Sequence, residues 1–305
     1  MVWIESNELI LFAIEHTMHA IFAENFPPNL PQNRHKQPVL FVGHGSPSNI
    51  IGANIFRHTL ECLGEYWGEG KAFKTPELIL CISAHWCTHG STLTAMQNPK
   101  TIHDFGGYSK EMFSQQYSAP GSPEWAAKLS ARLKSAQSGE PLALDASEWG
   151  FDHGNWAVLK PLFPKALVPV IQLSLDVGAN LAQHLELGLQ LGALREQGVL
   201  IVASGNIVHN LGASVRQAGD FESHPWAKAF DTWVSEQVQA RDLQALCMKG
   251  VSNEVLDLIR ISHPSIDHYI PLLYAMGASS PEDKMSYFND RFQWASVSMR
   301  SMLWH

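Results

Sequence analysis

The sequence predicts an α/β fold in a single domain, with a mostly parallel central sheet flanked by helices on both faces. Apolar segments typical of strands alternate along the chain with segments whose apolar residues recur at helical spacing. The strand-like segments are almost continuously apolar, as expected for strands that are buried on two sides. No internal repeat and no change of composition divides residues 37–305, which favours one domain.

The expected elements begin at residue 38. Four apolar segments are predicted to be strands: PVLFVG (38–43), ELILCISAHW (77–86), LVPVIQLSLD (167–176) and GVLIVASGN (198–206). Capping residues and apolar spacing predict helices over 54–69, 122–136, 180–198, 224–239 and 267–278, the last with Asp267 as its N-cap. A further helical start is expected at IVHNLGASV, and residues 285–290 and 292–301 are expected to form closing strands.

Residues 1–36 are expected to be an N-terminal extension and linker. A short amphipathic stretch at about 8–24 runs into NFPPNLPQNRHKQP, which is rich in Pro and Asn. The apolar start of the chain carries Glu5, Glu8 and Glu15 and has no basic segment, so it makes a poor signal peptide. The compact domain is therefore predicted to span 37–305.

Composition excludes several classes of partner. The formal net charge is -8 and the pI about 6.0, without a basic run, so neither nucleic acid nor a membrane surface is an expected partner. No window reaches the roughly 18 apolar residues of a membrane span. The 4 cysteines show no disulfide spacing, which is typical of the cytoplasm. Whether the chain forms a homo-oligomer stays open.

Three histidines stand where predicted strands end. His44 follows the first strand in GHGSP, His85 ends the second in SAHW, and His209 comes shortly after the fourth. The carboxyl ends of parallel strands meet at one edge of a sheet, which is where ligands bind in such folds. Glycine on both sides of His44 permits a tight turn and a close approach to the ring. The sequence therefore predicts a cluster of imidazoles in one cleft.

A cluster of neutral imidazoles is typical of a site for divalent Zn, Fe, Ni or Cu. SHPSIDHY supplies two more candidates, His263 and His268, at the start of the last helix. Carboxylates at strand ends are few: Asp176 and Asp152 are the best candidates, and Asp152 is better explained by fixing a loop or accepting a hydrogen bond from a histidine. His103 in TIHDFGGYS and His153 in WGFDHGNWAVL lie in segments expected to be loops that reach the same cleft.

Eight motifs in this order resemble the 4,5-DOPA extradiol dioxygenase family, a branch of the class III, protocatechuate 4,5-dioxygenase-like ring-cleavage enzymes. They are GHGSP, SAHW, TIHDFGGY, YSAPGSPE, WGFDHGNWAVL, VPVIQLSLD, SGNIVHNL and DHYIPLLYAMGA. The resemblance covers roughly residues 38 to 301. It implies an enzyme with non-haem Fe(II) that opens a small catechol ring beside its two hydroxyls with O2, and that also accepts Zn(II). Residues 37–305 would then be the catalytic domain.

The resemblance also implies a role for each histidine. His44, His85 and His268 would be metal ligands, and His209 would be either the acid/base residue or a fourth ligand. His103 and His153 would line the substrate pocket, with His153 also stabilising charge on oxygen. Many class III relatives have a Glu where His268 stands here, which leaves the choice between iron and zinc open. His263 remains the alternative to His268.

Two other functions fit the same histidines. A zinc hydrolase or amidase would use three imidazoles and a water position. A scaffold homologue would keep the fold without the chemistry. Oxygen consumption with a catechol distinguishes the first alternative from a dioxygenase, and a metal assay distinguishes the second.

Overall fold

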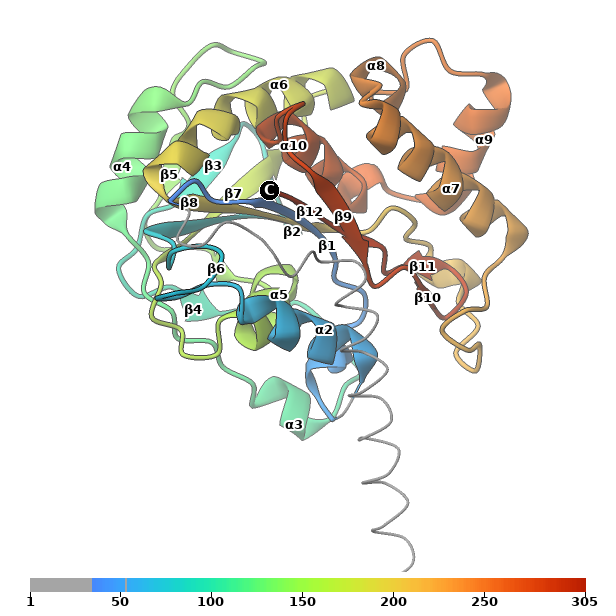
Figure 1. The fold of residues 1–305 in the computed structure, drawn as a ribbon, viewed down its shortest axis with the longest axis horizontal. Coiled ribbons are helices and arrows are strands. Elements are labelled where there is room, and N and C mark those ends of the chain that lie inside the picture. The colour runs from blue at the N-terminus through green and yellow to red at the C-terminus, as the bar shows by residue number, and fades with distance from the viewer. Residues whose placement is uncertain (1–34, 53) are drawn as a thin grey trace, which may run out of the picture.

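A computed structural model describes residues 35–52 and 54–305, and an eight-stranded sheet lies at its centre, in the order β5-β3-β7-β2-β8-β1-β12-β9 (Figure 1). The four predicted strands form its middle: β1 (Val39–Gly43), β2 (Leu78–Thr88), β7 (Val170–Asp176) and β8 (Val199–Gly205). These four strands pair in parallel. The predicted α/β fold with a mostly parallel sheet is confirmed.

The edges of the sheet are shorter and partly antiparallel. On one side β12 (Ser301–Trp304) pairs antiparallel with both β1 and β9 (Met285–Phe288). On the other side β3 (Thr92–Thr94) pairs antiparallel with β7 and parallel with β5 (Ala143–Asp145). The closing strand expected over 285–290 is present as β9, but the one expected over 292–301 is wrong: that segment holds only two two-residue strands in a separate sheet, and the edge strand β12 begins at Ser301. The three-residue edge strands β3 and β5 carry too few residues to show a periodicity.

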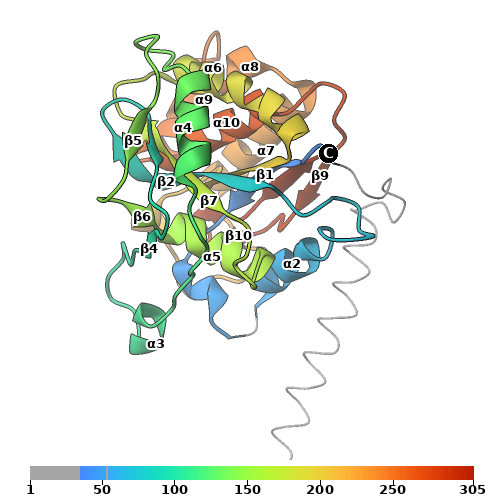
Figure 2. The same ribbon diagram turned by 90° about the vertical axis from the view of Figure 1, so that its left-hand side faces the viewer.

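Helices cover both faces of the sheet, as Figure 2 shows. One face carries α4 (Pro123–Arg132), α6 (Leu181–Leu191), α7 (Pro225–Ala240), α8 (Leu243–Leu246), α9 (Asn253–Ser262) and α10 (Ile270–Ala278). The other carries α2 (Ile55–Gly64), α3 (Lys110–Phe113) and α5 (His153–Leu162). Alternate residues of β1 enter the two cores: Val39 and Phe41 face the first layer, and Leu40 and Val42 the second. This alternation explains why each strand is apolar throughout.

Three other local expectations were wrong. The segment around His153 is the start of helix α5 and not a loop, because the Asp152 side chain caps it by accepting from the backbone N–H of Asn155. Asp267 does not cap α10, which follows Tyr269 without a side-chain cap. The expected helix after β8 is only the 3₁₀ turn η3 (Leu211–Ala213).

The remaining elements are short. They are η1 (Pro47–Ile50), β4 (Lys100–Thr101), β6 (Gly150–Phe151), η2 (Gly192–Gln197), η4 (Ile266–His268), β10 (Phe292–Gln293) and β11 (Val297–Ser298). Among the residues described, no helix has the length and apolar character needed to cross a bilayer. The amphipathic stretch and most of the linker expected before residue 37 lie outside the described residues, so the boundary at 36/37 stays a prediction.

The turn after β1 shows why His44 has glycine on both sides. Gly45 has a φ of +55°, a backbone conformation that favours glycine. A Cβ on Gly43 would lie 2.8 Å from the backbone of Met299. The backbone N–H of His44 donates to the carbonyl of Gly205 at the end of β8. The two glycines therefore let the chain turn sharply while His44 stays tied to the neighbouring strand.

Candidate metal centre

Four imidazoles from distant parts of the chain meet at the carboxyl end of the sheet. His44 follows β1, His85 lies near the end of β2, His153 begins α5 and His268 ends η4. The ring centroid of His44 lies 5.0 Å from that of His85 and 5.2 Å from that of His268, and the His85 and His268 centroids are 4.9 Å apart. The clustering expected from the strand ends is therefore present.

The position of His85 depends on an irregularity in β2. The pairing of β2 with β7 slips between Ile82 and Cys87, so the strand carries extra residues around His85. Such bulges bend a strand and redirect a side chain. The slip accompanies the approach of the His85 ring to those of His44 and His153, whose centroids lie 5.0 and 3.9 Å from it.

Each ring of the cluster has a polar partner at its Nδ1 atom. His153 Nδ1 donates to Asp104 Oδ2 at 2.9 Å, and His85 Nδ1 lies 3.3 Å from the same oxygen. His268 Nδ1 donates to Asp267 Oδ2 at 2.6 Å. His44 Nδ1 shares a 3.0 Å hydrogen bond with the hydroxyl of Ser204.

These partners fix which ring nitrogen carries the proton. A carboxylate only accepts hydrogen bonds, so the proton of His153 and of His268 is assigned to Nδ1, and the Nε2 atom is left with a bare lone pair. His268 Nε2 is buried and has no hydrogen-bond partner among the described residues. The Nε2 atoms of His44 and His85 lie only 3.1 Å apart. The cluster thus presents lone pairs to a common space, as metal ligands held by carboxylates do.

Burial favours the neutral form of the His44, His85 and His268 rings by lowering their pKa values. It lowers the pKa of His85 to about 3, with the nearby His153 adding to the effect. Burial likewise holds the pKa of His44 and of His268 well below the ordinary value, and neighbouring imidazoles add to it. Burial alone would raise the pKa of Asp104, but its hydrogen bond with His153 and the nearby imidazoles hold that pKa at about 2. Neutral rings backed by a charged carboxylate suit a divalent cation.

The spacing of the rings fits a single metal ion. Imidazoles that bind one ion through nitrogen at about 2.0–2.1 Å have ring centres roughly 5 Å apart. The separations among His44, His85 and His268 are 4.9 to 5.2 Å. A second grouping shares two of these residues: the ligand atoms of His44, His85 and His153 all lie within 4.8 Å of one another. Both groupings contain His44 and His85, and they differ in the third ligand.

His209 stacks on His268. The two ring centroids are 3.5 Å apart and the ring planes differ by only 2°. His209 is half-buried, and burial lowers its pKa to about 4. Its position beside the cluster agrees with the expectation that it reaches the same cleft.

The other candidates from the sequence lie outside the cluster. His103 donates through Nε2 to the carbonyl of Gln115 and packs against Phe105, whose ring is 5.7 Å from that of His153. His263 donates through Nε2 to the carbonyl of Ile207, so this nitrogen is already committed.

The carboxylates at the cluster are not those singled out at strand ends. Asp152 caps α5 and accepts from the Ser83 hydroxyl, so it fixes a loop and contacts no imidazole nitrogen. Asp176 accepts from two glycine N–H groups in a turn. The side chains that bind the imidazoles are Asp104 and Asp267, whose roles the sequence reasoning missed. A signal was available, since each stands directly beside a histidine, in IHDF and IDHY.

Comparison with known proteins agrees with this geometry. Residues 38–297 match the family described as the catalytic LigB subunit of aromatic ring-opening dioxygenase. A protein of Escherichia coli (strain K12) named 4,5-DOPA dioxygenase extradiol is 38% identical over 269 residues, which is 88% of this chain and 94% of that protein. A protein of the same name from Beta vulgaris is 32% identical, covering 86% of this chain and 94% of its own length.

A solved structure has the same fold. The crystal structure of an uncharacterized protein from Escherichia coli K12 superposes with a TM-score of 0.68 at 33% identity, covering 88% of this chain and 99% of that one. The family match identifies a ring-opening class of enzyme, and the histidine cluster is a group that could hold its metal ion. The chain belongs to the LigB family of aromatic ring-opening dioxygenases. The resemblance seen in the sequence motifs is confirmed.

Proposed function

We propose that the protein is an extradiol dioxygenase that opens the ring of a small, DOPA-like catechol with O2, in a catalytic domain spanning residues 37–305. The observation that carries this proposal is the convergence of three neutral imidazoles at 4.9 to 5.2 Å spacing, with the Nε2 atom of His268 buried and unpartnered. Relatives named for 4,5-DOPA cleavage in a bacterium and in plants support the class of substrate.

His44, His85 and His268 are the proposed metal ligands. His153 is the weaker third ligand, because its ring centre lies only 3.9 Å from that of His85. Two rings that bind one ion at about 90° or more would be farther apart than this. Fe(II) is the proposed catalytic metal, with Zn(II) as an ion that the same nitrogen ligands also accept. The chemistry that such an ion supplies is Lewis acidity toward the catechol hydroxyls and, for iron, one-electron chemistry with O2.

His209 is the proposed acid/base residue and not a fourth ligand. A metal ion lies close to the plane of an imidazole that binds it. Two parallel rings 3.5 Å apart, as His209 and His268 are, cannot both contain the same ion in their planes. A neutral, half-buried ring beside the ligand set is instead placed to accept a proton from a catechol hydroxyl and to return it later.

His153 is proposed to stabilise charge on the substrate oxygen. Its ring is held by Asp104, which accepts from Nδ1 at 2.9 Å and from the backbone N–H of His153 at 2.9 Å. The ring of Phe105 contacts the rings of both His153 and His103. His103 is therefore proposed to shape the substrate pocket indirectly, by packing against Phe105.

Oxygen uptake by the metal-loaded protein tests the proposal. The protein is loaded with Fe(II) without air, mixed with simple catechols, and monitored for O2 consumption and a yellow ring-opened product. Turnover that requires O2 supports the dioxygenase, and turnover that proceeds without O2 identifies a hydrolase. The cysteine spacing supports a cytoplasmic location as part of the same proposal.

A further inference from the structure

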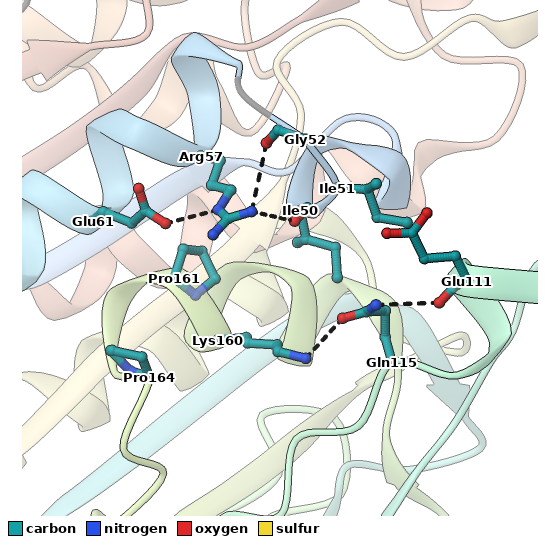
Figure 3. A pocket seen from close by; sticks show the side chains of 10 residues that line it. All are labelled: Ile50, Ile51, Gly52, Arg57, Glu61, Glu111, Gln115, Lys160, Pro161 and Pro164. Carbon is teal, nitrogen blue, oxygen red and sulfur yellow. Dashed lines mark hydrogen bonds and ion pairs between the residues drawn. The ribbon is translucent and has the colours of Figure 1, made fainter. Parts of the chain in front are cut away.

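Two cavities lie one behind the other between α2, α5 and η1. The outer one has a volume of about 280 Å³ and opens at the exposed residues Gly52 and Pro164. Figure 3 shows Arg57 and Lys160 pointing into it from α2 and α5. The inner one has a volume of about 20 Å³ and is bounded by His44. A small space thus adjoins His44, a proposed metal ligand.

The two cavities share a wall. Ile50 and Arg57 line both of them, so these two residues lie between the outer space and the inner one. Arg57 is held in place by its bonds to Glu61 Oε1 at 2.7 Å and to the carbonyl of Ile50 at 2.9 Å (Figure 3). Its guanidinium group is therefore fixed beside the junction by a charge-assisted bond at each end.

The inner cavity is mainly apolar and very small. Phe56 and Leu60 of α2, Ala157 and Val158 of α5, and Ile50 and Met299 form its apolar wall, and polar side chains of His44, Ser46, Asn49, Arg57 and Asn289 line the rest. A space of about 10–15 Å³ on this measure holds one water-sized molecule. The cavity therefore has room for a diatomic gas and none for a catechol. Apolar cavity walls favour gases such as xenon over water, so the apolar part of this space is the expected place for a gas molecule.

Other residues at the imidazole cluster are partly exposed to solvent. The side chains of His85 and Asp267 are 19% and 26% exposed, and His209 is half-buried. His44 is only 7% exposed and borders the inner cavity. A catechol is expected to reach the cluster through these partly exposed residues, whereas the inner cavity borders the buried His44.

We propose that the two cavities form a passage that delivers O2 to the His44 side of the site, separate from the catechol entrance, with Ile50 and Arg57 at its narrowest point. This inference rests on the proposed dioxygenase function. A separate entrance lets O2 reach the site while a bound catechol covers the open side.

Kinetics with varied O2 test the passage. Ala157→Leu fills the inner cavity, and Ile50→Phe narrows the junction. Each is expected to lower kcat/KM for O2 roughly tenfold, equivalent to about 1.4 kcal/mol of added barrier, and to leave KM for the catechol unchanged. Ala182→Leu makes the same change on α6, on the opposite face of the sheet, and is expected to leave both constants unchanged.

Xenon binding to the metal-free protein gives a readout that does not depend on activity. A crystal pressurised with xenon is expected to show an atom in the inner cavity of wild type and of Ala182→Leu, and none in Ala157→Leu. Absence of xenon from the wild-type cavity overturns the passage. So does an unchanged kcat/KM for O2 in an Ala157→Leu enzyme that excludes xenon. Lack of O2 consumption by wild type with every catechol would instead refute the proposed function, and the xenon result would stand by itself.

Discussion

Replacing His209 with phenylalanine separates the two roles open to this residue. The His209 ring lies parallel to that of His268 at 3.5 Å. A phenylalanine ring keeps this stack and the shape of the site, but it neither binds a metal nor carries a proton. His209→Phe is therefore expected to retain the metal and lose turnover. His209→Ala is expected to lose turnover as well, and also the stack, which is worth about 0.5–1.5 kcal/mol of stability.

The expected loss follows from the chemistry of proton transfer. Removing a general acid/base lowers the rate by about 10²–10⁴-fold. This corresponds to roughly 2.7–5.5 kcal/mol of lost transition-state stabilisation. Steady-state kinetics with a catechol give kcat, and elemental analysis of the same protein gives the metal content. Denaturant unfolding compares the stabilities of the Phe and Ala variants.

Two results would refute this reasoning. Loss of the metal together with activity in His209→Phe would make His209 a ligand, against the parallel-ring argument. A kcat within an order of magnitude of wild type would remove the acid/base role, because the loss would be smaller than general acid/base catalysis supplies.

Further predictions concern the ligands and the stability of the fold. Elemental analysis is expected to find no metal in purified His268→Ala, whereas His153→Ala keeps the metal and loses turnover. The reverse pattern would make His153 the third ligand in place of His268. Asp104→Asn should weaken metal affinity by about 10–100-fold, measured by competition with a chelator, because Asp104 supports His153 and contacts His85. Arg195→Met removes the buried partner of the Asp283 carboxylate and leaves it only the Ser280 N–H and the more distant, exposed Lys36. The change should cost about 3–5 kcal/mol in urea unfolding at pH 7, and an unchanged midpoint would contradict this. Burial acts to raise the pKa of Asp283, but Arg195 holds it below the ordinary value. Because the pKa of Asp283 is lower in the folded than in the unfolded protein, its ion pair with Arg195 stabilises the fold fully above the unfolded pKa of about 3.9. This stabilisation is lost as the pH falls through the folded pKa. The unfolding free energies of wild type and Arg195→Met should therefore converge in acid.

The sequence was sufficient for the framework and for the main histidines. Four continuous apolar strands and intervening amphipathic segments have strong periodic signals, so the parallel core of the sheet was predicted. His44 and His85 were identified because they end such strands, and His209 because it follows one. Their meeting at one edge of the sheet is a consequence of parallel topology.

The details beyond the strands depend on contacts that a single sequence does not display. Helix α5 was missed because Gly154 and Pro161 lower its propensity, while packing against β2 and β8 stabilises it. The carboxylates that orient the imidazoles were missed because Asp104 reaches His153 across 49 residues of chain, along a path set by loops. His268 and Asp267 are adjacent, yet their hydrogen bond became evident only with the η4 turn in view.

Anomalous diffraction from crystals of the Fe(II)-loaded protein tests the central claim most directly. We expect one ion bound to the Nε2 atoms of His44, His85 and His268, with the Nδ1 atom of each ring keeping its present partner and His209 outside bonding distance. An ion bound by His153 in place of His268, or no ion between these rings at all, would contradict it.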